Sequence, residues 1–458
     1  MMDCDPGRVM QIICAAGAPL EDGRNTMSQD ATTSSPQMGL TGQGAGEKPR
    51  GNVRYGIWLI SFLTFFVAYL DRANVSVLIA DRHYTQALGI TGDKSLQGLL
   101  MTAFLLSYGL ASFFIGPIID RIGPRKVLIY NLIFWAALMV AMASSASLYI
   151  HLACRSLLGL TEAMAAPVCS KLIHTWFPSR ERSKANGAWF VGLQLSLLVG
   201  IPLVTLVVAS FGWRISFISL AVLNVIPVFA CVALVYDTIA QHPRVSKEEM
   251  EYIESGKVRQ EHSHAAVTSY RFLFKRVFWL AAIVYGMNLA GFWGLLSWLP
   301  TYLRITHGFS WGLTGSLSAV PYVINTACLL VFTPLMDKYN SRAAFTSPAC
   351  ALLVVLMLLI SITGNPIMAV VFIAGYMGCI TVANCSLFPI LQNATDSNEV
   401  ATAVGFFTGI AYVFSSAFPY IMGAIYKRTG TLTASFYLFV AIGIVSFLAT
   451  VPMYKRRL

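Results

Sequence analysis

The chain has 458 residues, of which 56% are apolar and only 12% are charged, and its mean hydropathy is +0.65. A soluble protein of this length carries about twice that charged fraction, so water is excluded as the main solvent for the surface. The net charge of +11 would suit nucleic acid, but the positions of the basic residues along the chain assign it another role.

Twelve apolar runs follow the N-terminal segment, and each is long enough for a helix across a bilayer core of about 30 Å. We expect an all-α membrane protein whose twelve transmembrane helices form two pseudo-symmetric six-helix bundles. The expected spans are 55–79, 97–118, 127–147, 149–173, 187–210, 213–236, 277–303, 312–336, 344–363, 366–391, 401–426 and 432–454.

The segments outside these runs complete the expected domain organisation. Residues 1–54 are rich in Gly, Ser, Thr and Gln, and we expect a disordered cytoplasmic N-terminus, in which Met27 is a candidate start. An N-terminal bundle, a cytoplasmic linker, a C-terminal bundle and a cytoplasmic tail are expected at 55–236, 237–276, 277–454 and 455–458.

Basic residues fall mainly on one side of the expected membrane. If the N-terminus is cytoplasmic, that side holds Arg121, Arg125 and Lys126, together with all the Lys and Arg of the linker. This asymmetry follows the positive-inside rule and places both termini in the cytoplasm. It explains the net charge without nucleic acid, and we expect a multi-pass protein of the plasma membrane, the inner membrane in a bacterium.

A motif between the second and third runs carries two glycines and several charges. Its residues are Gly116, Asp120, Arg121, Gly123, Arg125 and Lys126. A degraded copy follows the eighth run at Thr333, Asp337, Lys338, Asn340 and Arg342. Repeated halves joined by a long linker are typical of transporters that bind substrate between the halves. The complete copy resembles the loop signature of the major facilitator superfamily, and we interpret it as a conformational latch for the outward-open state.

Four ionisable residues lie deep within the expected spans. Asp71 and Arg72 belong to the first, and Arg155 and Glu162 to the fourth. Such a residue costs at least about 3 kcal/mol at a helix centre, so it normally faces the bundle interior and marks a transport path. The two helices run in opposite directions, and counting the helical rise from the shared face places Asp71 and Arg155 at similar depth.

The spacing of these charges suggests separate roles. If Asp71 turns toward Arg155, then Arg72, rotated by about 100° on the helix, is left without a fixed partner and suits a carboxylate receptor. Glu162 shares a face with Arg155 and suits proton carriage, since burial and nearby cations act on a carboxyl in opposite directions. The alternative is that the charges only neutralise one another to permit insertion.

Two segments carry a more specific resemblance. Tyr69-Leu-Asp-Arg-Ala-Asn-Val-Ser76 and Arg155-Ser-Leu-Leu-Gly-Leu-Thr-Glu-Ala163 resemble the first-helix and fourth-helix segments of the anion:cation symporter family. This resemblance implies symport of an organic anion with protons. It also implies that Asp71 and Glu162 are protonation sites, that Arg155 couples to the aspartate and that Arg72 grips the substrate carboxylate. Tyrosines at the positions of Tyr69 and Tyr108 line the site in that family.

Other polar or aromatic residues are candidates for recognising the substrate. They are Gln194, Asn288, Trp293, Asn384 and Thr408, although helix packing is the commoner role for each alone. Sugar-acid permeases carry asparagine in the eleventh helix, where this chain has Thr408 and Tyr412. We therefore expect a substrate that is less hydroxylated than a hexonate and either aromatic or short-chain.

The expected partners are a small organic anion, protons and the lipid bilayer, with no nucleic acid, and the protein is expected to act as a monomer. No cofactor is expected, and no metal-ligand set, ATP-binding loop or enzyme nucleophile–base pair stands out in the sequence. A proton-coupled efflux antiporter and an anion receptor that does not transport are the alternative functions.

Overall fold

The structure, a computed structural model, describes residues 52–255, 270–339, 342–395 and 399–455, and the described part is helical. The N-terminal segment that was expected to be disordered, with Met27, lies almost entirely outside the described residues. The described chain contains twelve helices that are long and apolar enough to cross a membrane, which confirms the expected fold.

The first six spans come from residues 55–234. They are α2 (Tyr55–Leu78), α4 (Lys94–Ser112), α6 (Pro124–Ser144), α7 with α8 (Leu148–Glu162 and Ala165–Trp176), α9 (Arg182–Phe211) and α10 (Trp213–Leu234). The last six are α12 (Arg276–Thr301), α13 (Trp311–Tyr339), α14 (Arg342–Ile362), α15 (Pro366–Asn393), α16 (Val400–Thr429) and α17 (Thr433–Lys455). The shorter elements are α3 (Arg82–Ala87), α5 (Ile115–Ile122), α11 (Lys247–Ser255), the 3₁₀ turns Ile239–Gln241 and Arg271–Phe274, and a π turn at Tyr302–Thr306.

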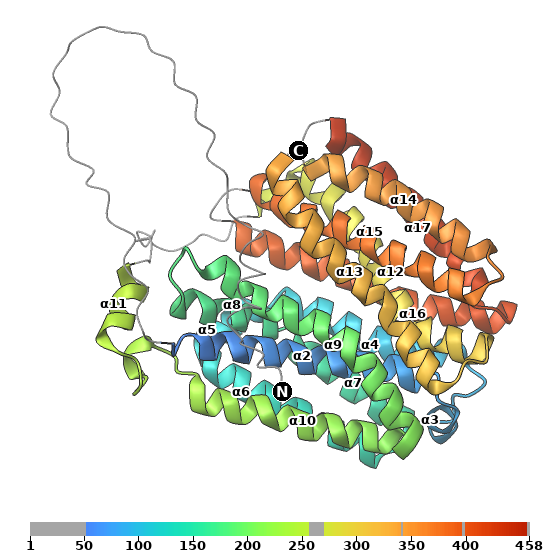
Figure 1. Ribbon diagram of the computed structural model, residues 1–458, viewed down its shortest axis with the longest axis horizontal. Helices are drawn as coiled ribbons and strands as arrows, with labels where there is room; N and C mark the ends of the chain where they lie inside the picture. Colours follow the sequence, from blue (N-terminus) through green and yellow to red (C-terminus); the bar gives the residue numbers. More distant parts are fainter. Residues whose placement is uncertain (1–51, 256–269, 340–341, 396–398, 456–458) are drawn as a thin grey trace, which may run out of the picture. The chain divides into compact units, whose positions relative to one another are not determined.

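Each half packs mainly within itself. In the first half, α2 packs along α9 and α10, while α4 lies on α7 (Figure 1). In the second half, α14 packs against α15 and α17, and α13 runs along α15. The halves meet where α4 lies along α16, α9 along α13 and α2 against α12. The interior side chains of α2 therefore lie next to the boundary between the halves.

The contact between α4 and α16 depends on glycine. A Cβ atom on Gly98 would lie 2.1 Å from the carbonyl oxygen of Pro419, and one on Gly423 would lie 2.1 Å from that of Lys94. No side chain fits at these distances, so glycine lets the two backbones touch. Asp93 also pairs with Lys427 across the two halves, and we call this face of the molecule the Asp93 end.

Two spans differ from their expected form. The second ends at Ser112, and the loop motif lies partly on the separate short helix α5. The fourth is interrupted after Glu162, where α7 ends and α8 begins at Ala165. Pro167, in the first turn of α8, has no N–H with which to continue the helical hydrogen bonds. The break makes Glu162 the last residue of α7.

Candidate functional site

The four deep charges lie together inside the first half. Asp71 and Arg72 are in the middle of α2, and Arg155 and Glu162 are on α7, which packs against α4. None of the four residues is more than 2% exposed. Because isolated charges are so costly at this depth, their contacts decide what the site can do.

Arg72 has a fixed partner. Its Nε donates to Oε2 of Glu162 at 2.7 Å, in an ion pair whose two side chains are at most 2% exposed. The expectation that Arg72 has no fixed partner is therefore wrong for this conformation. The rotation that turns Asp71 toward α7 and α10 turns Arg72 toward the end of α7, where Glu162 lies. The remaining atoms, Nη1 of Arg72 and Oε1 of Glu162, have no hydrogen-bond partner.

Arg155 and Asp71 lie at the same level, as the helical rise suggests, but their side chains are not paired. Nη1 of Arg155 donates to the backbone oxygen of Asp71 at 3.4 Å, and its Nε donates to the oxygen of Leu100 at 3.3 Å. Among the described residues, no ion pair joins the Asp71 carboxylate to Arg155, and both carboxylate oxygens lack a hydrogen-bond partner. The guanidinium donates to two helix carbonyls and to Sδ of Met101, so the Asp71 carboxyl is left without a partner.

Two asparagines near Asp71 were missed in the sequence. Asn74 is one turn further along α2, is fully buried and has no partner for either side-chain atom. Asn224 on α10 approaches the Asp71 carboxyl but donates its Nδ2 to the Leu220 oxygen at 3.0 Å instead. Only the spacing of Asn74 from Asp71 signalled this polar group in the sequence.

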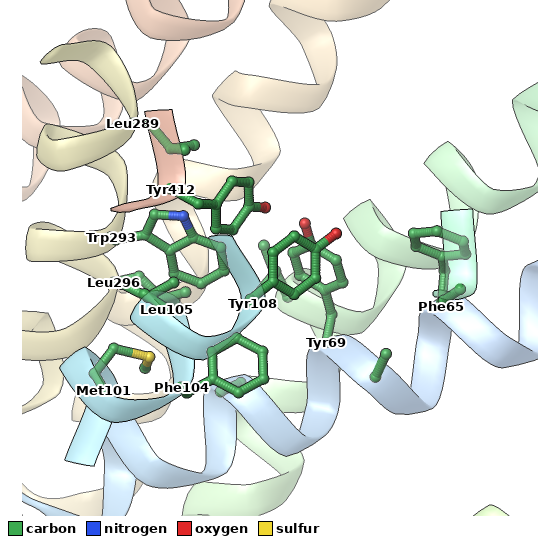
Figure 2. Packing of buried hydrophobic residues seen from close by; sticks show 14 of the residues in the cluster. Phe65, Tyr69, Met101, Phe104, Leu105, Tyr108, Leu289, Trp293, Leu296 and Tyr412 are labelled. Carbon is green, nitrogen blue, oxygen red and sulfur yellow. The ribbon is translucent and has the colours of Figure 1, made fainter. Parts of the chain in front are cut away.

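Aromatic rings surround the Arg72 guanidinium. The centroids of Tyr69, Phe104, Tyr108 and Trp293 lie 4.3, 4.9, 5.1 and 5.5 Å from Cζ of Arg72. Figure 2 shows these rings together with Tyr412, with α2 and α4 on one side and the C-terminal half on the other. We call these five residues the aromatic cage. Rings at such distances attract the cation and exclude water from it.

Three polar residues that were predicted to bind the substrate are hydrogen-bonded to other side chains of the protein. Gln194 donates to Oδ1 of Asn325 at 2.8 Å, across the boundary between α9 and α13. Asn288 donates to Oδ1 of Asn384 at 3.0 Å and accepts from Ser446 at 3.0 Å. In this conformation these amides connect helices. Thr408 is half-buried, one turn before Tyr412 on α16.

The latch motif contacts the segment that follows α10. The backbone nitrogen of Arg125 donates to Oδ1 of Asp237 at 3.2 Å, and its guanidinium lies 4.6 Å from the ring centroid of Tyr236. Gly123 has a φ of 89°, which glycine adopts without strain. The side chain of Asp120 lies outside the described residues, Gly116 has no close neighbour, and Arg121 and Lys126 are exposed.

Arg54, just before α2, is a buried residue whose role the sequence did not indicate. It pairs with Glu181 at 3.2 Å and with Glu249 of α11 at 3.0 Å, and Tyr252 of α11 donates to Glu181 at 2.7 Å. These bonds dock the beginning of the linker onto the N-terminal half. A single arginine at the edge of an apolar run is normally interpreted as a residue at the membrane surface. The sequence therefore contained no indication that Arg54 is buried.

The Asp93 end is held by an exposed ion pair. The hydrogen bond from Lys427, with that from Ser95, lowers the pKa of Asp93 to about 2, so this carboxylate stays charged at neutral pH. Within the described part of the chain, no group of His, Cys, Asp or Glu is placed to hold a metal ion.

Comparison with known proteins identifies the family of the chain. The family model described as "Major Facilitator Superfamily" matches residues 61–419. A probable sulfoacetate transporter of Cupriavidus necator is 30% identical over 64% of this chain and 67% of its own length. A probable L-galactonate transporter of Escherichia coli is 25% identical over 81% of this chain and 83% of its own length.

A solved structure has the same fold. It is a crystal structure of a bacterial homolog of the human lysosomal transporter Spinster, in an inward-facing and unoccupied conformation. The TM-score is 0.71 at 15% identity, and the match covers 90% of this chain and 99% of the other.

Proposed function

This chain belongs to the major facilitator superfamily, and we propose that it imports a small organic anion together with protons. Its family and relatives are transporters and not enzymes, and the relatives described above are named for organic anions. The observation that carries the proposal is the buried pair of Arg72 with Glu162, beside an Asp71 carboxyl that has no partner.

The four buried groups cancel when all are ionised, since two are cations and two are anions. An incoming carboxylate competes with Glu162 for the Arg72 guanidinium, which prefers to bind carboxylates in planar, paired hydrogen bonds. If it displaces Glu162, the site holds one uncompensated negative charge in a medium that penalises charge strongly. Protonation of Glu162 removes that charge. Anion binding and proton uptake are therefore linked at one residue.

Asp71 supplies a second place for a proton. Its carboxylate oxygens have no hydrogen-bond partner, and Arg155 contacts it only through the backbone. A buried carboxyl without a partner favours its neutral form, while the approach of a guanidinium favours the charged form. We propose that Arg155 moves onto the Asp71 carboxylate when the halves rearrange, releasing the proton. In this scheme Arg155 is the coupling residue and Asp71 a proton site.

The two halves provide alternating access. We propose that the Asp93 end faces the exterior and is closed here by the α4–α16 contact, and that the latch motif acts on the cytoplasmic side. Both termini would then be cytoplasmic, in the plasma membrane. A single chain holds all the groups that the scheme uses, so we propose that the monomer is the functional unit.

Transport by purified protein in liposomes tests the proposal. An acid-outside gradient is expected to drive accumulation of a labelled carboxylate above its external concentration. Arg72→Ala removes the receptor and is expected to abolish uptake, whereas Arg82→Ala, at an exposed position on α3, serves as a control that keeps it.

The alternatives give different results in the same liposomes. Depletion of the internal label by an acid-outside gradient would indicate an efflux antiporter. Binding of the anion without any exchange across the membrane would indicate a receptor. Uptake by Arg72→Ala at the wild-type rate would contradict the role of the guanidinium.

A further inference from the structure

The aromatic cage joins the two halves of the protein through two pairs of nearly parallel rings. Tyr69 of α2 faces Trp293 of α12 with a centroid separation of 6.3 Å and an interplanar angle of 25°. Tyr108 of α4 stacks on Tyr412 of α16 at 4.3 Å and 26°. Each pair takes one ring from each half (Figure 2). Flat apolar faces therefore border the Arg72 guanidinium from both sides of the central boundary.

Trp293 is exceptional among the fully buried tryptophans of the described chain. Trp135, Trp176 and Trp298 donate their Nε1 hydrogens to Thr161, Tyr236 and Pro419 at 3.0, 3.2 and 3.0 Å. The Nε1 of Trp293 has no acceptor, although the residue is 0% exposed. A buried indole N–H normally finds a partner, and leaving it without one costs about 1–3 kcal/mol. The indole N–H can therefore donate a hydrogen bond that it does not make in this conformation.

A second hydrogen-bond donor beside these rings also lacks an acceptor. Nη1 of Arg72 has no hydrogen-bond partner, and Cζ of Arg72 lies 5.5 Å from the Trp293 ring. The oxygens of an organic anion are the acceptors that a guanidinium and an indole N–H both lack here. These two donors, at one aromatic cluster, suit the acidic group of a substrate.

Apart from the phenol groups of its three tyrosines, the cage has few groups that suit hydroxyls. The amides of Gln194, Asn288 and Asn384 are hydrogen-bonded to other side chains. A polyhydroxylated acid that entered the cage would lose water from its hydroxyls and find few partners in return, which binding sites penalise strongly. Ring faces, in contrast, favour a flat π system over an aliphatic body of similar size.

We propose that the substrate is a flat aromatic or conjugated carboxylate, and that Trp293 is the residue that selects it. This inference rests on the proposed transport of an organic anion and narrows its substrate to one class. The indole contributes a face to the cage and an N–H to a substrate oxygen, while Arg72 neutralises the carboxylate. Tyr69, Tyr108 and Tyr412 provide the remaining faces.

Three probes of one charge separate the contributions. Benzoate is flat, cyclohexanecarboxylate has the same number of carbons without a π system, and galactonate is polyhydroxylated. Their affinities are measured as competitors of labelled-benzoate counterflow in liposomes and by calorimetry on the protein in nanodiscs. We expect benzoate to bind about tenfold more tightly than cyclohexanecarboxylate, and galactonate to bind most weakly.

Two variants test Trp293 itself. Trp293→Phe keeps a ring and removes the N–H. It is therefore expected to weaken benzoate binding about tenfold, while the three probes keep the same order of affinity. Trp293→Leu removes the ring as well and is expected to abolish the preference for benzoate over cyclohexanecarboxylate. Trp279→Phe is the matched control, because Trp279 is an exposed residue of the same helix that bonds to Leu273, and it is expected to behave as wild type.

The outcomes distinguish this inference from the proposed function. Galactonate competing as well as benzoate, no binding of benzoate, or an unchanged probe ratio in Trp293→Leu would each overturn the aromatic substrate class. Accumulation of galactonate under an acid-outside gradient would meanwhile leave proton-coupled import intact. If no carboxylate crosses the membrane under any gradient, the proposed function itself fails.

Discussion

At the scale of single residues, Glu162 is paired with Arg72, the residue proposed to bind the substrate carboxylate. In Glu162→Gln the amide keeps the shape of the side chain but takes up no proton on substrate binding. We therefore expect anion affinity to fall about tenfold per pH unit above neutrality in the wild type, as linkage to one proton requires, and to be flat with pH in the variant. Calorimetry between pH 6 and 9 measures both slopes.

The control for that experiment is Glu248→Gln, which removes an exposed carboxylate of α11 and is expected to leave the wild-type slope. Proton-driven accumulation should fall in Glu162→Gln, because only Asp71 then carries a proton, whereas exchange of labelled for unlabelled anion should persist. A variant that retained the full pH slope would place the linked proton elsewhere, with Asp71 as the first candidate.

Asp71 gives a residue-scale prediction about stability. Its carboxylate oxygens are buried without partners, and an unsatisfied buried polar group costs about 1–3 kcal/mol, more if it is charged. Asp71→Asn keeps the shape and removes the charge, so we expect its thermal midpoint at alkaline pH to exceed that of the wild type. A thermal unfolding series in nanodiscs measures this difference, and a lower midpoint for the variant would show that the carboxylate has a stabilising partner.

At the scale of helices, the α4–α16 contact predicts a conformational effect of glycine. In Gly98→Ala the new Cβ would meet the Pro419 oxygen at 2.1 Å, so the halves must separate at the Asp93 end. We expect Ser95→Cys, at a buried position of that contact, to react with a membrane-impermeant maleimide several times faster in the Gly98→Ala background. Labelling of that single peptide is followed by mass spectrometry.

Gly187→Ala is the matched helical control, because nothing lies within 4 Å of a Cβ at that position. It is expected to leave the labelling rate unchanged. Equal rates in Gly98→Ala and in the control would mean that the contact adjusts without opening, and the closed state of the Asp93 end would not depend on this glycine.

Features set by the membrane were predictable from the sequence, and those set by packing were not. The bilayer fixes how long an apolar helix must be, so spans such as α15 follow from hydropathy. The fixed helical rise likewise placed Asp71 and Arg155 at one level. Which neighbour Arg72 meets depends on how α2 is rotated against α7, and no sequence pattern gives that rotation. Arg54 was missed for the same reason, since its partners lie on other segments.

At the scale of the whole protein, the two carboxyl sites determine how much charge crosses the membrane. If Glu162 and Asp71 each carry a proton with one monovalent anion, each cycle moves one net positive charge. A potential of 100 mV, negative inside, then adds about 2.3 kcal/mol, or roughly fiftyfold in the accumulation ratio. With only Glu162 active, the cycle is electroneutral and the potential adds nothing.

We therefore expect a potassium diffusion potential, imposed with valinomycin, to raise anion accumulation in wild-type liposomes and to have no effect in Asp71→Asn. The pH is clamped on both sides of the membrane so that only the electrical driving force changes. Stimulation of the variant to the wild-type extent would assign the second charge to another group, whereas a wild-type protein insensitive to potential would limit coupling to one proton. Because Arg155 contacts Asp71 only through its backbone oxygen here, the second proton must leave in a conformation in which that arginine has moved.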